Sequence, residues 1–349
     1  MMQFARSFLS RLLSAARWIV RILFAPDHFG VPLHLRIWYA VFGGYMVDQV
    51  ALYDFKHNDK KQYLSEFDWI RSRQINEPYN SLLDNKVVFA ELVRDYCPTP
   101  ELYAVKKGSR ITGMGSRHLD CMDDVFALLR REGAFVVKPV RGGKGGGVHI
   151  VKYNDGVITD DGRECTPDEL RCTLEKQHDW FICALAHQAD YLNEIYAESA
   201  NTIRMIVLRD TPEREFELAF AVQRIGAGWT GSVDNGSKGG LIANVNIATG
   251  ELSEARTLHD LMVYNVHPDS GHPIKGVVIP NWESIKKGVL EVSSHFPYLD
   301  IIAWDILPTP DGFTVIEANT SSGVNIIQLW GPQRYGRLGQ FYRDHGIIK

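Results

Sequence analysis

Residues 135–153 read FVVKPVRGGKGGGVHIVKY, a glycine- and lysine-rich loop between two apolar, β-branched runs. Six of the nine residues at 141–149 are glycine or lysine. Both flanking runs alternate as strands do, so the pattern predicts a strand, a loop and a second strand. A P-loop is excluded because no Ser or Thr follows a Gly-Lys pair, and G-x-G-x-x-G is excluded because Gly143 and Gly145 lead to Val148.

A glycine-rich loop between two strands is typical of a flap over a nucleotide. Residues without side chains let backbone N–H groups approach phosphate oxygens closely. Lys138, at the end of the first strand, could meet the α- and β-phosphates through its ammonium group. The residues expected to contact the nucleotide here are Lys138, Arg141, Gly142, Gly143, Lys144, Gly145 and Gly146. The alternative is a glycine hairpin without a ligand, although each glycine makes such a connection entropically costly.

A second group of chemically informative residues lies at 301–325, IIAWDILPTPDGFTVIEANTSSGVN. The Pro-Asp-Gly turn at 310–312 predicts a hairpin in which Asp305 lies across from residues 316–318. Glu317 and Asn319 are two residues apart on one strand, so both point to one face. Three oxygen ligands at this density suit Mg²⁺. Ordinary surface acids on a half-exposed hairpin are the alternative, but a carboxylate inside the apolar TVIEA run needs a partner.

Taken together, the glycine flap, the strand lysine and the Asp/Glu/Asn hairpin resemble the ATP-grasp superfamily across about residues 81–325. In that superfamily two lysines contact ATP phosphates, and the Asp, Glu and Asn hold one or two Mg²⁺ ions, for which Mn²⁺ can substitute. The run EANTSSG is similar to the corresponding segment of the D-alanine–D-alanine ligases. The residues that carry the resemblance are Lys86, Lys138, Arg204, Asp305, Glu317 and Asn319.

The middle of the chain resembles one branch more narrowly, the sugar-transfer-associated ATP-grasp family. The similar segments are NTIRMIVL at 201–208, the run from RIGAG to TGEL at 224–252, and HPDSGHPIKGVVIPNW at 267–282. The resemblance implies an association with polysaccharide biosynthesis. The chain departs from the superfamily at the adenine hinge, where an acidic residue is usual. The candidate hinge here consists of Cys183, Ala184, Leu185 and Ala186.

Two arginines are candidates for stabilising charge on a transferring phosphoryl group. Arg204 points off the strand IRMIVL, and a guanidinium there suits a phosphate or acyl-phosphate oxygen. Arg224 ends another strand and is a weaker candidate of the same kind. For each of them the alternative is a surface arginine on a strand.

The loops after these strands hold the candidate substrate residues. Asn235 opens a turn-rich loop in which Gly239 and Gly240 could offer backbone N–H groups to a substrate oxyanion. A plain hairpin loop is the alternative. His267 and His272 could be zinc ligands, but no third ligand accompanies their spacing. A rigid loop facing the substrate and a purely structural loop are the other interpretations.

The N-terminal segment 1–24, MMQFARSFLSRLLSAARWIVRILF, contains four arginines and no acidic residue. Helical spacing puts the arginines on one arc and large apolar residues on the opposite arc. The arginines interrupt the uncharged core of about 7–15 residues that a secretory signal needs, and the run of about 20 apolar residues that a spanning helix needs. The segment is therefore predicted to be an interfacial helix on an anionic membrane, or an amphipathic helix packed on its own domain or a partner.

The resemblance implies an α+β ATP-grasp fold in which two α/β lobes grip ATP. The expected domains are a helical N-terminal subdomain at 1–80, a small lobe with the flap at 81–175, and a large lobe with the metal site and C-terminal tail at 176–349. A net charge of −4 argues against a nucleic-acid binder that relies on bulk charge. The five cysteines fit neither a disulfide framework nor a zinc cage, and reduced thiols indicate a cytosolic enzyme.

The expected function is that of an ATP- and Mg²⁺-dependent carboxylate–amine ligase, which forms an amide through an acyl phosphate. Its substrates would be small molecules, with a sugar-derived carboxylate or amine among the candidates and no nucleic acid. Two alternatives remain open: a phosphotransferase on the same fold, and a non-catalytic nucleotide-binding scaffold at the membrane. The expected location is the cytoplasm, with peripheral contact at the inner face of the membrane through residues 1–24.

Overall fold

The computed structural model describes residues 18, 25–142 and 146–349. The predicted basic helix at 1–24, apart from Trp18, and the flap residues Gly143, Lys144 and Gly145 lie outside the described residues. The chain divides into two compact units. The first comprises Met1–Ser72, Leu258–Met262 and Gly323–Lys349, and the second comprises Arg73–Thr257 and Val263–Ser322. The lobes implied at 81–175 and 176–349 remain a prediction.

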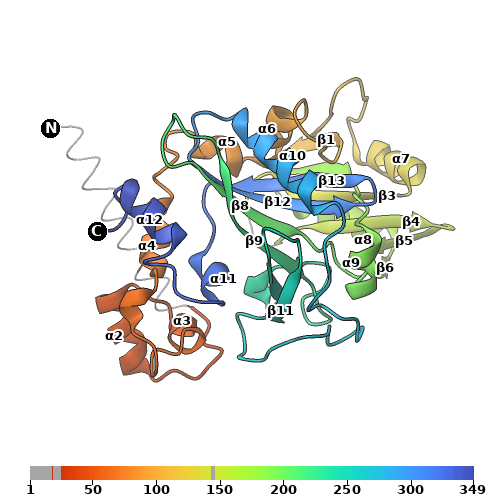
Figure 1. Cartoon of the computed structure of the whole chain (residues 1–349). Coiled ribbons are helices and arrows are strands. Elements are labelled where there is room, and N and C mark those ends of the chain that lie inside the picture. Colours follow the sequence, from red (N-terminus) through yellow and green to blue (C-terminus); the bar gives the residue numbers. More distant parts are fainter. Residues whose placement is uncertain (1–17, 19–24, 143–145) are drawn as a thin grey trace. The chain divides into compact units, whose positions relative to one another are not determined.

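The second unit contains a seven-stranded sheet in the order β2-β1-β7-β3-β4-β5-β6, with every neighbouring pair antiparallel (Figure 1). The strand β7 follows residue 175 in sequence but lies inside this sheet, between β1 and β3. The strands are β1 (Leu102–Lys107), β2 (Arg110–Gly113), β3 (Ala134–Pro139), β4 (His149–Asn154), β5 (Val157–Asp160), β6 (Arg163–Cys165) and β7 (Trp180–Ala184).

The predicted strand–loop–strand is confirmed, because β3 pairs with β4 in register from Ala134↔Lys152 to Val137↔His149. The side chains of β3 alternate between the two faces of the sheet, and the two faces have different roles. Phe135 and Val137 belong to the core formed with helices α7 (Met122–Glu132) and α8 (Pro167–Lys176). Helix α7 ends at Gly133, which adopts φ +75° and donates its N–H to the Leu129 carbonyl.

A six-stranded antiparallel sheet in the same unit has the order β11-β10-β9-β8-β12-β13. The predicted hairpin around residues 310–312 is its edge pair, in which Asp305 lies directly opposite Glu317. The strands are β8 (Ile203–Leu208), β9 (Glu217–Ile225), β10 (Leu241–Val245), β11 (Leu252–Arg256), β12 (Ile301–Thr309) and β13 (Gly312–Asn319).

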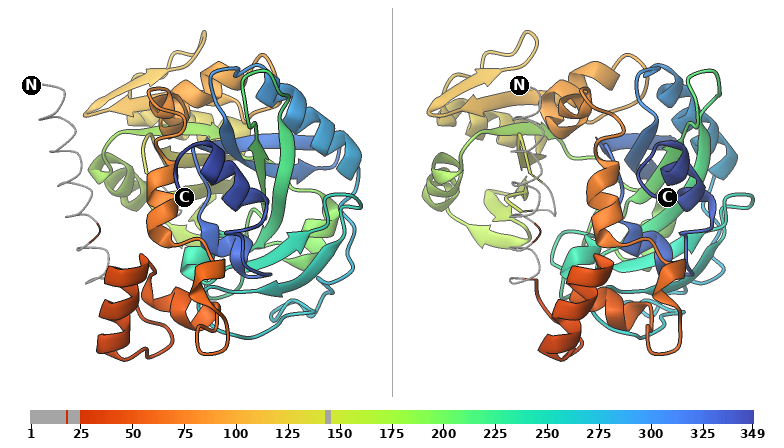
Figure 2. Two further views of the ribbon diagram at one scale, coloured as in Figure 1. Left: turned by 60° about the vertical axis from the view of Figure 1, so that its left-hand side comes forward. Right: turned by 90° about the vertical axis from the view of Figure 1, so that its left-hand side faces the viewer.

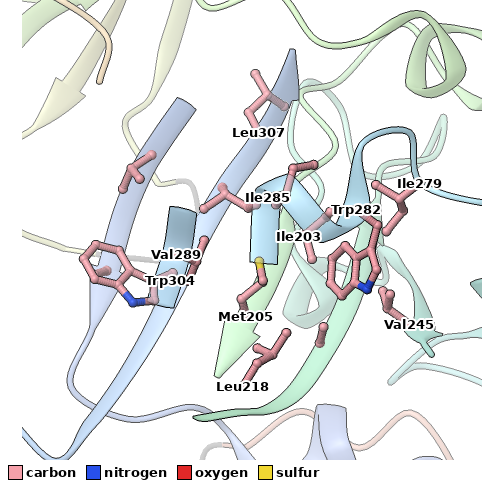
Figure 3. Packing of buried hydrophobic residues seen from close by; sticks show 14 of the residues in the cluster. Ile203, Met205, Leu218, Val245, Ile279, Trp282, Ile285, Val289, Trp304 and Leu307 are labelled. Carbon is pink, nitrogen blue, oxygen red and sulfur yellow. The ribbon is translucent and has the colours of Figure 1, made fainter. Parts of the chain in front are cut away.

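One face of this sheet packs on helix α10 (Trp282–Ser294), as Figure 3 shows. Ile203 and Met205 of β8 and Trp304 of β12 point into this core together with Ile285 and Val289 of the helix. Successive strand residues face opposite sides, so Arg204 and Asp305 point to the other face. The remaining helices of the unit are α5 (Asn80–Asp84), α6 (Lys86–Val93), α9 (Asp190–Ile195) and the 3₁₀ turn η2 (Gly236–Lys238).

The first unit is helical in its described part and joins segments that are far apart in sequence. Gln328 donates an N–H to the carbonyl of Leu64 at 2.9 Å and accepts the Leu64 N–H at 2.8 Å. Both views in Figure 2 show α12 beside α4, where the Tyr342 hydroxyl lies 3.0 Å from that of Ser72. The helices are α2 (Leu33–Gly43), α3 (Val47–Leu52), η1 (Lys60–Gln62), α4 (Glu66–Ser72), α11 (Val324–Gln328) and α12 (Arg337–Asp344). No described helix is both long and apolar enough to cross a bilayer.

Candidate active site

The second unit contains a cavity lined by residues of both sheets and by loops between their strands. Its larger apolar lining residues include Val136, Val148, Ile150, Leu185, Leu307 and Ile316. Its charged lining consists of Lys86, Lys138, Arg224, Asp234, Asp305 and Glu317. An apolar surface beside a cluster of charges can accept a ligand with a flat ring at one end and an ionic group at the other.

Lys138 reaches the cavity because of the alternation along β3. Val136 and Lys138 share the face opposite to the helix-covered one, and both line the cavity. Gly142 and Gly146, on either side of the undescribed part of the flap, line it as well. Arg141 is exposed and lies outside the residues found to line the cavity.

Asp305 is the most deeply buried carboxylate of the cavity, with 1% of its surface exposed. Arg204 lies directly opposite it on β8 and donates a hydrogen bond from Nε to Oδ1 and another from Nη2 to Oδ2, the second at 2.8 Å. Arg224 Nη2 lies 3.3 Å from Oδ2. Burial raises the pKa of Asp305, whereas Arg204 and Arg224 act in the opposite direction. A carboxylate between two guanidinium groups is held in one orientation.

Glu317 and Lys86 form an ion pair that joins β13 to the first residue of helix α6. Lys86 Nζ lies 2.5 Å from Glu317 Oε2. Burial of Glu317 favours its neutral form, but the Lys86 charge and hydrogen bond outweigh burial and hold the pKa of Glu317 well below its usual range. Lys86 lines the cavity, and in this structure its ammonium group binds a carboxylate of the candidate metal site.

A β-bulge in β13 brings two consecutive side chains to the cavity. Asp305 pairs with Glu317, but the next residue of β12, Ile306, pairs with Val315. Ile316 is therefore the extra residue of the bulge, and both Ile316 and Glu317 line the cavity. Bulges often re-aim side chains next to functional sites. This one sets an apolar side chain beside an acidic one.

Thr202 and Asp234 also belong to the site, although neither is among the predicted site residues. Both line the cavity. Asp234 accepts the Thr202 N–H at 2.8 Å and the Thr202 hydroxyl at 2.6 Å, and the hydroxyl oxygen in turn accepts Arg224 Nε–H at 3.0 Å. Arg224 lines the cavity, whereas Arg204 lies behind Asp305 and is not among the lining residues. The weaker of the two arginine candidates is thus the more accessible one to a ligand.

The residues predicted to bind a metal fit that role in two respects. Asp305 and Glu317 lie opposite each other, and Asn319 follows on the same strand opposite Ala303. The buried Nδ2 of Asn319 has no hydrogen-bond partner among the described residues, and this is unusual for a buried polar atom. The nitrogen and oxygen of an amide are assigned from their partners, so an amide whose nitrogen is unsatisfied can be turned to present its oxygen to an ion. Two carboxylates and one amide are donors that Mg²⁺ accepts.

The predicted oxyanion contact from Gly239 and Gly240 is corrected by the structure. Both glycines are buried, and their N–H groups already donate to the carbonyls of Gly236 and Asn235, at 3.0 and 3.1 Å. The loop closes on itself through a short helical turn. This agrees with the alternative interpretation of the segment as a plain hairpin loop. Asn235 lines the cavity, but its side-chain oxygen accepts the Ser237 N–H at 2.8 Å and caps this turn.

The structure places His267 in the interior and does not make it available to a substrate. Its ring is completely buried, stacks on Tyr196 with centroids 4.6 Å apart, and lies 2.8 Å through Nε2 from the Gly226 carbonyl. His272 is partly exposed and lies 3.0 Å from the Pro273 carbonyl. Neither histidine lines the cavity. The geometry favours the structural interpretation of this loop over a zinc or substrate site.

The candidate hinge is divided between the cavity and the sheet. Ala184, Leu185 and Ala186 line the cavity. Cys183 pairs with Val136 inside the seven-stranded sheet and is buried, and burial raises the pKa of its thiol. Cys183 therefore shapes the sheet, while the three residues after it form the edge that a ligand would meet.

A family described as sugar-transfer associated ATP-grasp matches residues 70–340 of the chain. No curated protein sequence matches this chain. Similar solved structures include D-alanyl-alanine synthetase A from Vibrio cholerae (11% identity, 76% of this chain and 64% of that one, TM-score 0.45). A second is D-alanine–D-alanine ligase from Helicobacter pylori (13% identity, 75% of this chain and 61% of that one, TM-score 0.41). A third is the ATP-grasp ligase PsnB with precursor peptide PsnA2 and AMPPNP (13% identity, 78% of this chain and 61% of that one, TM-score 0.39). The chain spans less than two thirds of each of these three proteins.

Proposed function

Because the chain belongs to the sugar-transfer associated ATP-grasp family, we propose that its cavity binds ATP and that the chain is a carboxylate–amine ligase. The observation that carries the proposal is the lining of one cavity by Val136, Leu185 and Ile316 together with Lys138 and Glu317. The apolar side chains suit an adenine ring. The lysines and the acidic hairpin suit a triphosphate with its metal.

The charge balance of the site supports a polyanionic ligand. The cluster contains four cationic side chains and three carboxylates, so one positive charge is in excess before a ligand binds. The cations are Lys86, Lys138, Arg204 and Arg224, and the carboxylates are Asp234, Asp305 and Glu317. We assign the phosphate contacts to Lys138 and Arg224, since both line the cavity. Arg204 orients Asp305 from behind.

Asp305, Glu317 and Asn319 are the residues that would hold Mg²⁺, which when bound supplies charge stabilisation for the phosphates. Lys86 and Arg204 hold the two carboxylates in place through their ion pairs. With its carboxylates already oriented, the site needs little rearrangement when a ligand arrives.

The proposed reaction has two steps. An oxygen of a substrate carboxylate attacks the γ-phosphorus, and the bond to the β,γ-bridging oxygen breaks. ADP departs, and the carboxylate has become an acyl phosphate. An amine then attacks the acyl carbon, phosphate leaves with the bonding electron pair, and the amine loses a proton as the amide forms. Arg224 offsets negative charge on the transferred group, and the flap excludes water from the acyl phosphate. We propose a sugar acid or an amino sugar as one of the two partners, in the cytoplasm.

The test is ADP release measured over a matrix of carboxylates and amines, with the product mass determined. Glu317→Gln should lower turnover by about 100-fold or more, because a positioned charge is lost from the phosphoryl-transfer site. Glu283→Gln, at an exposed position of α10, is the matched control. Equal turnover in wild type and Glu317→Gln would contradict the assignment.

The mass of the product separates the remaining functions. An amide that requires both acceptors supports the ligase. A stable phosphoester formed from a single acceptor would show a phosphotransferase on the same fold. ATP-dependent thermal stabilisation without ADP formation over the whole matrix would favour a nucleotide-binding scaffold.

A further inference from the structure

Asp234 uses its two carboxylate oxygens unequally. Oδ2 accepts the N–H and the hydroxyl of Thr202 at 2.8 and 2.6 Å, and it lies 3.5 Å from Nε of Arg224. Oδ1 accepts no hydrogen bond from the residues that the structure describes. Asp234 is 8% exposed and lines the cavity. A nearly buried carboxylate usually fills its acceptor positions, so Oδ1 is the position left for a donor from a ligand.

The loop that carries Asp234 is held in place on both sides of this residue. Val233 forms a parallel bridge with Ala200. The Asn235 carbonyl accepts the Gly240 N–H at 3.1 Å. A Cβ added at Gly240 would lie 2.6 Å from the carbonyl oxygen of Asp234, so the turn packs tightly against the backbone of Asp234. The carboxylate is therefore positioned before a ligand arrives.

A single guanidinium group connects Asp234 to the candidate metal site. Arg224 Nε is 3.5 Å from Asp234 Oδ2, and Arg224 Nη2 is 3.3 Å from Asp305 Oδ2. Arg224 is also the residue to which we assign a phosphate contact. Asp234 therefore lies close to the place where the proposed acyl phosphate reacts.

The negative charge of Asp234 indicates which ligand its free oxygen can accept. A carboxylate repels phosphate and carboxylate oxygens, so Oδ1 suits neither the triphosphate nor the first substrate. An alkylammonium group offers three N–H donors and a positive charge, and hydrogen bonds between charged groups are about twice as strong as neutral ones. A hydroxyl group offers one neutral donor. The geometry and charge thus favour an amine over an alcohol.

We propose that Asp234 Oδ1 binds the second substrate as a primary ammonium ion and that the chain discriminates against hydroxyl acceptors. This inference rests on the proposed ligase function. The ammonium ion first loses one proton to solvent, which frees the lone pair that attacks the acyl carbon. The nitrogen releases a second proton as the C–N bond forms, and Asp234 Oδ1 accepts it before returning it to solvent. Phosphate leaves with the electron pair of the broken C–O bond.

The first test compares acceptors on the full wild-type chain with Mg²⁺, ATP and the carboxylates of the matrix. Each amine is paired with the alcohol that replaces its amino group, so glucosamine is compared with glucose and ethanolamine with ethylene glycol. We expect amide from the amine of a pair and no ester from the alcohol. Ester formation as fast as amide formation would overturn the inference. An acyl phosphate that hydroxylamine traps, but that no amine of the matrix converts to an amide, would overturn it as well.

The second test is Asp234→Asn, which keeps an oxygen for Thr202 and removes the charge. The KM for the amine should rise by about tenfold or more, because a hydrogen bond between charged groups is lost. Hydroxylamine is uncharged at neutral pH and intercepts the acyl phosphate directly, so hydroxamate formation and the KM for ATP should stay unchanged. Asp311→Asn, at the exposed turn between β12 and β13, removes a carboxylate elsewhere in the second unit. It is the matched control and should behave as wild type does.

The remaining outcomes separate this inference from the proposed function. An unchanged KM for the amine in Asp234→Asn would overturn the inference. A raised KM for ATP or slower hydroxamate formation would assign Asp234 to the nucleotide or to the first step, and would also overturn it. Absence of hydroxamate with the wild-type chain would instead contradict the ligase function on which the inference rests. Circular dichroism melts establish that both variants are folded, and the comparison of acceptors requires neither variant.

Discussion

The Thr202 hydroxyl connects two charged groups in the cavity, because it donates to Asp234 and accepts from Arg224. One oxygen atom thus acts as donor and acceptor in the same small network. A change at Thr202 therefore affects both neighbours, although neither charge is removed.

We expect Thr202→Val to lower the free energy of unfolding by about 1–3 kcal/mol, because Asp234 and Arg224 each lose a buried hydrogen-bond partner at nearly constant volume. Urea denaturation measures the change. Thr112→Val, at an exposed position of β2, should stay within about 0.5 kcal/mol of wild type. Equal effects of the two substitutions would show that the network contributes nothing to stability.

His149, at the start of β4, adds a pH-dependent contribution. Its Nδ1 lies 3.0 Å from both carboxylate oxygens of Asp160, and this hydrogen bond raises the pKa of His149 although burial opposes it. A raised pKa in the folded state stabilises it below the unfolded value of about 6.5, and the contribution is lost as the pH rises through the folded value.

The difference in unfolding free energy between wild type and His149→Gln should therefore be larger at about pH 6 than at about pH 8.5. Urea denaturation at the two pH values measures it. In an Asp160→Asn background the same substitution should lose its pH dependence. A difference that grows with pH would contradict the assigned ion pair.

Residue types at the site are easier to predict than their partners. Asp305 could be placed across from residues 316–318 because one short turn connects the two strands, but its pairing with Glu317 depends on the bulge at Ile316. Which of the two arginines is the more accessible to a ligand could not be predicted. It depends on Thr202 and on Asp234, which lies 32 residues further along the chain than Thr202. The free Nδ2 of Asn319 is likewise visible only in three dimensions.

At the scale of elements, the flap is the connection whose backbone matters most. Gly142 has φ +119° and lines the cavity, while Gly156, in the turn between β4 and β5, has φ +89° and does not. An added Cβ would meet no atom of the described residues within 4 Å at either position. Both glycines therefore have a positive φ that disfavours a side chain, but only Gly142 lies at the cavity.

Gly142→Ala and Gly156→Ala should each cost about 1 kcal/mol of stability, because both place alanine at positive φ. Only Gly142→Ala should also raise the KM for ATP, since it alters the root of the flap. Melting temperatures and steady-state kinetics of both variants measure this. A similar KM increase in Gly156→Ala would show that the effect does not come from proximity to the cavity.

Strands follow from patterns within each element, which explains why the flap hairpin could be predicted. The β-bulge at Ile316 could not, because it is a property of the pairing between β12 and β13. Regular alternation would have turned Ile316 away from the face of Glu317.

At the scale of the molecule, the first unit is assembled from three separate stretches of chain. The aromatic cluster of Tyr45, Tyr53, Phe55 and Tyr63 forms part of its interior. The return of residues 323–349 to this unit could not be predicted from the sequence, because it depends on contacts such as those of Gln328 with Leu64.

Calorimetry should reveal whether ATP acts on one unit. The cavity belongs entirely to the second unit, so Mg²⁺ and ATP at about 100 times the dissociation constant should stabilise that unit by about 2.7 kcal/mol. We expect one transition that rises in temperature and one that does not, with EDTA reversing the rise. A rise of equal size in both transitions would contradict a nucleotide site confined to the second unit.

The bulge residue Ile316 has no pairing partner on β12, so it could be deleted while the pairings on either side are kept. Deleting Ile316 leaves Glu317 opposite Asp305 and Val315 opposite Ile306, the pairings that already exist, so the shortened strand gains a regular ladder. Deleting Val315 instead would draw Ile316 into the buried slot opposite Ile306 and strain the hairpin. The first deletion should yield a folded protein with weakened ATP binding, and the second should lower the melting temperature. Length variation within this family should accordingly concentrate at position 316.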